Sequence, residues 1–210
     1  MRSASLRGLA GSLGVLALLL AGSARAEPLG AVEGRVRLAV TGLEIARAGP
    51  LVVFLVPFDP VAVPVPDEVP EISQKGARFE PPFLVITAGQ TVRIPNDDSI
   101  THNAFSYSQP NAFDLGLYPK GDARTITARA PGAIRVFCSI HKSMNAVIFA
   151  APTPWHTLAA ADGSFRIADV PDGRYRVATW NERLPPAAAE VLVAAPEVMR
   201  VDLLLGADAR

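Results

Sequence analysis

Four residues with metal-binding side chains stand in two short stretches of the chain. Cys138 is the only cysteine, His141 and Met144 follow it at intervals of three residues, and His102 precedes it with Asn103 directly behind. One thiolate, two imidazoles and one thioether form the ligand set of a mononuclear type 1 (blue) copper site, which transfers single electrons. Residues three apart in a tight loop can point to a common centre, and a ligand from another strand ties that loop to the core. The pattern therefore predicts copper bound by His102, Cys138, His141 and Met144.

Each of these residues also has a plain interpretation. Cys138 could be a small core residue, the two histidines could lie in surface loops, and Met144 could pack in the core. Zinc is an alternative metal because cysteine and histidine also suit it, whereas a thioether as fourth ligand favours copper. The remaining histidine, His156, is interpreted as non-ligating and as lying at the hinge between two modules.

The first 26 residues have the pattern of a signal peptide. Arg2 and Arg7 precede an apolar run over 9–21, and Ala24-Arg25-Ala26 has the small-x-small form of a cleavage site. We expect the mature chain to begin at Glu27 and to be exported to the periplasm. The alternative is an uncleaved membrane anchor, although the apolar run is short for a membrane span.

The charge balance gives no sign of a nucleic-acid partner. The whole chain has 20 basic and 20 acidic residues. Removal of residues 1–26 takes away three arginines and no acid, which leaves 17 basic against 20 acidic residues and a formal charge of −3. Nucleic-acid binding requires a basic face.

The composition predicts an all-β protein. The chain contains 19 prolines and 16 glycines, with no long helical periodicity between them, which indicates many short strands joined by turns. Strands are predicted at 32–40, 51–56, 83–87, 91–95, 124–128, 133–138, 145–150, 165–167, 175–179, 191–193 and 198–205. In the strand before the cysteine, Ile134, Val136 and Cys138 share one face, so the sulfur should point into the core.

The distribution of prolines and turns predicts two modules. Residues 27–57 supply N-terminal strands, a proline-rich connector covers 58–70, the metal-binding module covers 71–152, and residues 153–210 form the last part. We expect Trp180 to cover the core of that last part. Its strands are few for a stable sandwich alone, so they should need partners from the N-terminal segment.

Residues 71–152 resemble the cupredoxins, and the spacing Cys138-x2-His141-x2-Met144 is that of the amicyanin and pseudoazurin branch. Phe79, Pro82, Gly89, Val92, Asn96, Asp98 and His102-Asn103 look like the first half of that module. The resemblance implies a Greek-key β-sandwich, with His102, Cys138 and His141 as equatorial ligands and Met144 as the axial one.

Two further residues take roles from this resemblance. Asn103 would donate its backbone N–H to the sulfur and connect the two ligand loops with its side chain. Ile140 stands where many relatives have proline, so its N–H could donate a second hydrogen bond to the thiolate. On that hypothesis, Ile140→Pro lowers the reduction potential.

The rest of the chain resembles a second type of domain. The opening Glu33-Gly34-Arg35-Val36, the turn at Asp162-Gly163 and the stretch 171–175 look like parts of a carboxypeptidase regulatory-like domain, a small transthyretin-like β-sandwich. The copper module would then be inserted into this host domain; alternatively, residues 32–56 complete the cupredoxin sheet. The whole chain resembles bacterial periplasmic proteins often labelled methylamine utilization proteins.

The predicted function is single-electron transfer between periplasmic redox proteins, such as a c-type cytochrome or a dehydrogenase. Four protein ligands leave no open position for substrate, which predicts that the protein is not an enzyme. The alternatives are a copper carrier or storage protein and a partner-binding module that the metal only stabilises.

Overall fold

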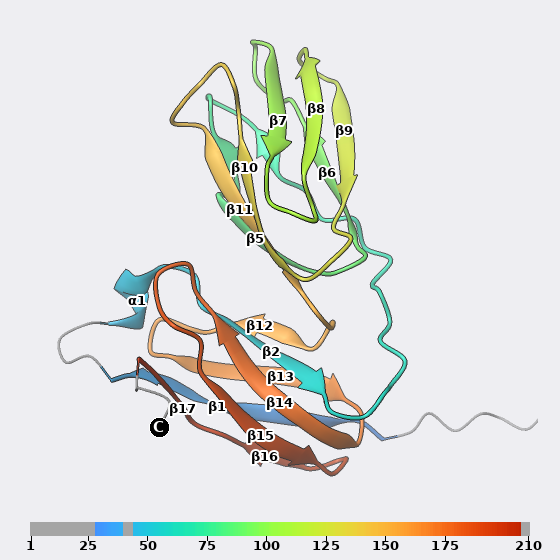
Figure 1. The fold of residues 1–210 in the computed structure, drawn as a ribbon, viewed down its shortest axis with the longest axis vertical. Coiled ribbons are helices and arrows are strands. Elements are labelled where there is room, and N and C mark those ends of the chain that lie inside the picture. Colours follow the sequence, from blue (N-terminus) through green and yellow to red (C-terminus); the bar gives the residue numbers. More distant parts are fainter. Residues whose placement is uncertain (1–27, 40–43, 207–210) are drawn as a thin grey trace, which may run out of the picture.

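The protein is almost entirely β-structure, as predicted. The computed structural model describes residues 28–39 and 44–206 (Figure 1). The single helix in these residues is the short α1 (Ile45–Ala48), and no helix in them is long and apolar enough to cross a membrane. The predicted signal peptide, residues 1–26, lies outside the described residues.

One sandwich is built from the two ends of the chain. Its first sheet has the order β13 (Ser164–Val170), β1 (Gly30–Leu38), β16 (Val198–Arg200), with β17 (Leu203–Leu205) also paired to β1. Its second sheet has the order β12 (His156–Leu158), β2 (Val52–Pro57), β14 (Gly173–Trp180), β15 (Ala188–Val193). We call this sandwich the terminal module. Its core contains Val32, Val36, Val53, Leu55, Trp155, Phe165, Ile167, Tyr175 and Val177.

Both N-terminal strands pair with strands that follow residue 155. β1 runs antiparallel to β13 and parallel to β16 and β17, while β2 lies between β12 and β14. In Figure 1, the blue and cyan strands accordingly lie among the orange and red ones. Among the described strands, β1 and β2 have no partner from the strands of residues 73–151. This pairing supports the proposal that the upper module is inserted into a discontinuous host, whose boundaries stay predictions.

We call the part of the chain from β3 to β11 (residues 73–151) the inserted module, and it contains the predicted metal ligands. Its main sheet has the order β5 (Phe83–Thr87), β11 (Asn145–Ala151), β10 (Gly132–Phe137), β7 (His102–Ser106), β8 (Phe113–Tyr118). β6 (Thr91–Pro95) pairs with β9 (Ala123–Thr127), and β3 (Ser73–Gln74) forms a hairpin with β4 (Phe79–Glu80). The core between these layers includes Ile72, Phe79, Ile86, Val92, Ile94, Ala104, Ile126, Ile134, Val136, Cys138, Met144, Ala146 and Ile148.

Strand parity places the cysteine as predicted. Ile134 and Val136 are fully buried and Cys138 is 5% exposed, all within the core of the inserted module. His102 is the first residue of β7, a strand that the sequence analysis did not predict. β7 lies between β10 and β8 in the sheet, so the first imidazole comes from a strand adjacent to the one that precedes the cysteine.

A third apolar cluster joins the two modules. We call it the interface cluster: Val52, Phe149 and Ala151 are buried in it, and Phe54, Phe83, Val85, Ala133 and Trp180 pack against them. Trp180 stacks on Phe149 with ring centroids 4.5 Å apart. The expectation that Trp180 covers the terminal core is therefore wrong, since the face of β14 that bears it packs against the inserted module.

Candidate metal centre

Three of the four predicted ligands converge on one point. His102 begins β7, whereas Cys138 and His141 belong to the loop that follows β10. The Sγ of Cys138 lies 3.9 Å from Nδ1 of His102 and 3.9 Å from Nδ1 of His141. All three donor atoms lie within 4.8 Å of one another. One sulfur and two imidazole nitrogens in this arrangement match the equatorial donors of a type 1 copper site.

The backbone of the loop brings Met144 back to the same core. The Cys138 N–H donates to the Met144 carbonyl oxygen over 3.2 Å, and the Met144 N–H donates to the His141 carbonyl oxygen over 2.9 Å. The Met144 side chain is 1% exposed and belongs to the core cluster that contains Cys138. These two hydrogen bonds close the loop as a compact turn.

The site is sealed on one side and open on the other. His102 is fully buried and Cys138 nearly so, whereas the His141 ring is partly exposed. The two rings are 4.8 Å apart between centroids. Of the three donor residues, His141 is therefore the one that solvent reaches most easily.

Asn103 connects the two ligand segments. Its Oδ1 accepts hydrogen bonds from the Ser139 N–H, at 2.8 Å, and from the Ser139 hydroxyl, at 3.0 Å. This contact ties the residue after His102 to the residue after Cys138. Among the hydrogen bonds of residues 28–39 and 44–206, none runs from the N–H of Asn103 or Ile140 to the sulfur, so the expected donor roles are not seen.

The sequence prediction did not identify Asp98 as part of this site. One carboxylate oxygen, Oδ2, accepts from the Ala77 N–H at 2.7 Å and lies 3.0 Å from Nε2 of His102. The other, Oδ1, accepts from the Ser99 N–H at 2.8 Å. Donation by the Ala77 N–H and then by His102 lowers the pKa of Asp98 to about 2. The signal in the sequence that could have identified Asp98 is its position four residues before His102.

A buried polar pair supports the segment between β6 and β7. The Gln74 side chain donates to the Tyr118 hydroxyl, which in turn donates to the Ile94 carbonyl oxygen over 3.0 Å. Burial of the phenol raises the pKa of Tyr118 to about 12, so it remains a neutral donor. The Asn96 side chain also donates to the carbonyl oxygens of Ile100 and Tyr118, at 2.9 and 3.0 Å. The loop that precedes His102 is thus held from several sides.

His156 lies away from the donor cluster. It begins β12, and its Nε2 is 3.4 Å from the Thr87 hydroxyl of β5, across the junction between the modules. Burial lowers the pKa of its imidazole. The position agrees with the interpretation of His156 as a hinge residue.

The donor set fits copper. A cysteine sulfur and two imidazole nitrogens are soft and intermediate donors, and their common centre is largely shielded from water. Both rings turn Nδ1 toward the sulfur, whereas Nε2 of His102 contacts Asp98. A metal ion at this centre would therefore need no change of ring orientation.

Comparison with known proteins finds similar folds among copper proteins. No protein-family model and no curated protein matches the chain. A purple cupredoxin from Nitrosopumilus maritimus is 22% identical with a TM-score of 0.36, over 39% of this chain and 99% of that chain. Amicyanin from Paracoccus versutus (Thiobacillus versutus) is 22% identical with a TM-score of 0.37, over 46% of this chain and 97% of that chain. The carboxypeptidase regulatory-like and methylamine utilization resemblances stay predictions.

One similar structure corrects the prediction that the protein is not an enzyme. A Cu-containing nitrite reductase from Thermus scotoductus SA-01 is 24% identical with a TM-score of 0.39, over 55% of this chain and 28% of that chain. The prediction that the protein is not an enzyme, which rested on the four protein ligands, is therefore withdrawn.

Proposed function

We propose that the inserted module binds one copper ion through His102, Cys138, His141 and Met144 and that the protein transfers single electrons between periplasmic redox partners. The observation that carries the proposal is the convergence of Cys138 Sγ with both Nδ1 atoms, each at 3.9 Å. When bound, copper supplies a centre that changes its charge by one electron. A type 1 geometry would require the Met144 thioether as a weak fourth ligand, and this thioether also favours copper over zinc.

The surroundings of the site support rapid exchange with a partner. A rigid donor set lowers the reorganisation that accompanies electron transfer, and here the Asn103 bonds and the closed loop restrain the ligands. The partly exposed His141 gives a short route to the surface. Exposed apolar side chains stand beside the ligands: Ile140 precedes His141, Ile100 lies two residues before His102, and Leu117 pairs with Asn103. A small apolar surface suits a transient contact with a c-type cytochrome or a dehydrogenase.

The visible spectrum of the copper-loaded protein tests the site. We expect an intense thiolate-to-copper absorption band that is lost in Cys138→Ser. Ser143→Ala is the matched control, because Ser143 is an exposed residue of the same loop and should leave the band unchanged. A copper-loaded wild-type protein without this band would refute the proposed site.

Voltammetry then separates electron transfer from the alternatives. A redox carrier should give a reversible one-electron wave with fast exchange at the electrode. A copper carrier or storage protein, or a module that the metal only stabilises, has no need for fast exchange. A coloured protein with slow, irreversible exchange would therefore reject electron transfer while retaining copper binding.

A further inference from the structure

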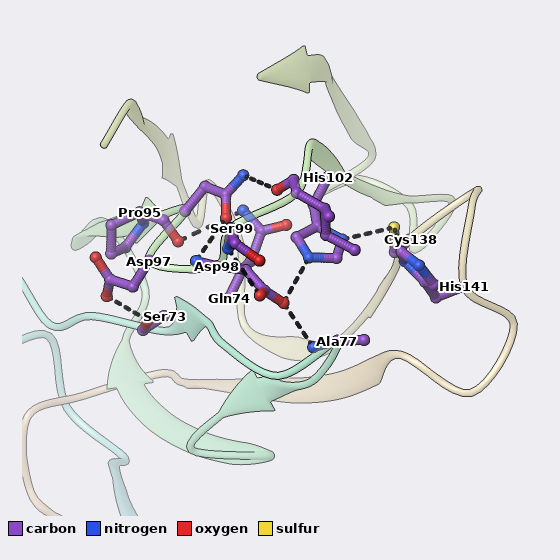
Figure 2. A network of polar contacts seen from close by, with 12 residues as sticks. Ser73, Gln74, Ala77, Pro95, Asp97, Asp98, Ser99, His102, Cys138 and His141 are labelled. Carbon is purple, nitrogen blue, oxygen red and sulfur yellow. Dashed lines mark hydrogen bonds and ion pairs between the residues drawn. The ribbon is translucent and has the colours of Figure 1, made fainter. Parts of the chain in front are cut away.

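The Asp98 carboxylate stands between a hairpin turn and a proposed metal ligand. It belongs to the loop between β6 and β7, and its side chain is 15% exposed. Figure 2 shows it between Ala77, in the turn of the β3–β4 hairpin, and the ring of His102. It contacts Ala77 N and His102 Nε2 through the same oxygen, at 2.7 and 3.0 Å.

This contact determines which nitrogen of His102 is free. An ionised carboxylate only accepts hydrogen bonds, so Nε2 must carry the proton that fills the 3.0 Å contact. In the neutral ring, Nδ1 then keeps its lone pair, and this atom faces Cys138 Sγ at 3.9 Å. The ring is fully buried, so bulk water does not compete with Asp98 for this contact. The contact therefore favours the tautomer that metal binding requires.

The hairpin backbone holds the carboxylate in place. Ala77 has a φ of 52°, in the left-handed region, and this unusual conformation accompanies its N–H contact with Asp98. The neighbouring residue, Asp97, is held by the same hairpin: its N–H donates to the Gln74 carbonyl oxygen at 3.0 Å, and its carboxylate accepts from the Ser73 hydroxyl at 2.5 Å. The loop is therefore fixed by contacts that do not involve His102.

We propose that Asp98 is a positioning residue of the metal centre, which holds His102 as the Nε2–H tautomer and, through its negative charge, favours the oxidised copper state. The inference rests on the proposed function for its copper-dependent part. A carboxylate that accepts from a ligand imidazole raises the basicity of that ligand, and loss of such a partner typically weakens metal binding by roughly 10–100-fold. Cu(II) has the higher charge, so it should lose more affinity than Cu(I).

Asp98→Asn tests the charge, and Asp97→Asn is its matched control. Both variants remove one carboxylate from the same loop, but the Asp97 carboxylate bonds Ser73 and not a metal ligand. In Asp98→Asn we expect Cu(II) affinity to fall roughly 10–100-fold. A tenfold loss confined to Cu(II) raises a one-electron potential by about 59 mV. In Asp97→Asn both quantities should stay close to wild type. Equal shifts in the two variants, or no shift in Asp98→Asn, would overturn the role of this charge.

Nuclear magnetic resonance of the copper-free wild-type protein tests the tautomer without any variant. Nitrogen-15 shifts of the His102 ring should identify Nε2 as the protonated nitrogen. A ring protonated on Nδ1 alone would overturn the positioning role, even if Asp98→Asn failed to fold. This readout is independent of copper, so absence of the thiolate-to-copper band would refute the proposed function and leave the tautomer result to decide the inference.

Discussion

Phe149→Ala should separate the two modules without disturbing the metal ligands. β11 alternates between two environments: Ile148 points into the core of the inserted module, whereas Phe149 and Ala151 belong to the interface cluster. Phe149 is 3% exposed, stacks on Trp180 at 4.5 Å and lies 5.7 Å from Phe54. Removal of its ring therefore leaves a cavity at the contact between the modules and not in the core that surrounds Cys138.

The magnitude follows from burial and from the two ring contacts. Replacement of a buried phenylalanine by alanine costs about 3–5 kcal/mol in protein cores. Within that figure, each aromatic pair contributes about 0.5–1.5 kcal/mol beyond the buried area. Because Phe149 is buried and contacts two rings, we expect a loss of about 3–5 kcal/mol, of which about 1–3 kcal/mol comes from the pairs. An ion pair between Arg135 of β10 and Glu182, which follows β14, also joins the modules at 3.0 Å. Both side chains are about half exposed, so this pair contributes too little to offset the lost packing of Phe149.

Urea denaturation of the copper-free protein measures this effect. Far-UV circular dichroism follows both modules, and tryptophan fluorescence follows the terminal module and the interface, since Trp155 is buried in the terminal core and Trp180 lies in the cluster. In Phe149→Ala we expect two resolved transitions, with the thiolate-to-copper band of the loaded protein retained.

Ile148→Ala is the matched comparison on the opposite face of β11. It should cost about 2–5 kcal/mol and lower the transition of the inserted module selectively. If Phe149→Ala stays within about 1 kcal/mol of wild type, the burial argument fails. If it abolishes the copper band, the separation of the two faces of β11 is wrong.

Two further substitutions test the terminal module and the junction. Gly34→Ala should destabilise the terminal module by about 1–3 kcal/mol or more, because a Cβ at this position would lie 1.7 Å from the Val201 carbonyl oxygen. Urea denaturation measures this loss of stability. A neutral effect would contradict the close approach of β1 and the β16–β17 segment. His156→Gln should flatten the pH dependence of stability. Burial holds the pKa of His156 below 6.5 in the folded chain, so the unfolded chain binds more protons than the folded one. The stability of the wild-type protein therefore falls as the pH drops below about 6.5. Unfolding free energies at several pH values check this, and an unchanged slope in the variant would exclude His156 as its source.

Short-range patterns predicted the local features well. The alternation around Ile134, Val136 and Cys138 predicted the correct buried face. The intervals of three predicted a tight loop, which closes through one hydrogen bond between Cys138 and Met144 and one between Met144 and His141. These features depend on residues close in sequence, whose periodicity reports directly on which side chains share a face. The β7 strand was missed because His102–Ser106 is short and mostly buried on both faces, so it shows no alternation.

Contacts between distant segments could not be inferred in the same way. Trp180 was assigned to the wrong core because periodicity identifies a buried face and not the surface that covers it. Asp98 was missed as a partner of His102 because its orientation depends on the Ala77 N–H, which the hairpin supplies from another part of the chain.

The sequence by itself determined the all-β character, the inward direction of the Cys138 side chain and the spacing of the proposed ligands, because each depends on local alternation or on one short loop. Only the tertiary structure decided that β1 and β2 pair with strands beyond residue 155, that Phe149 and Trp180 join the modules, and that a hairpin holds Asp98 against His102. These contacts join residues far apart in the chain, and their free energy comes from packing and hydrogen bonds that exist only after the strands have paired.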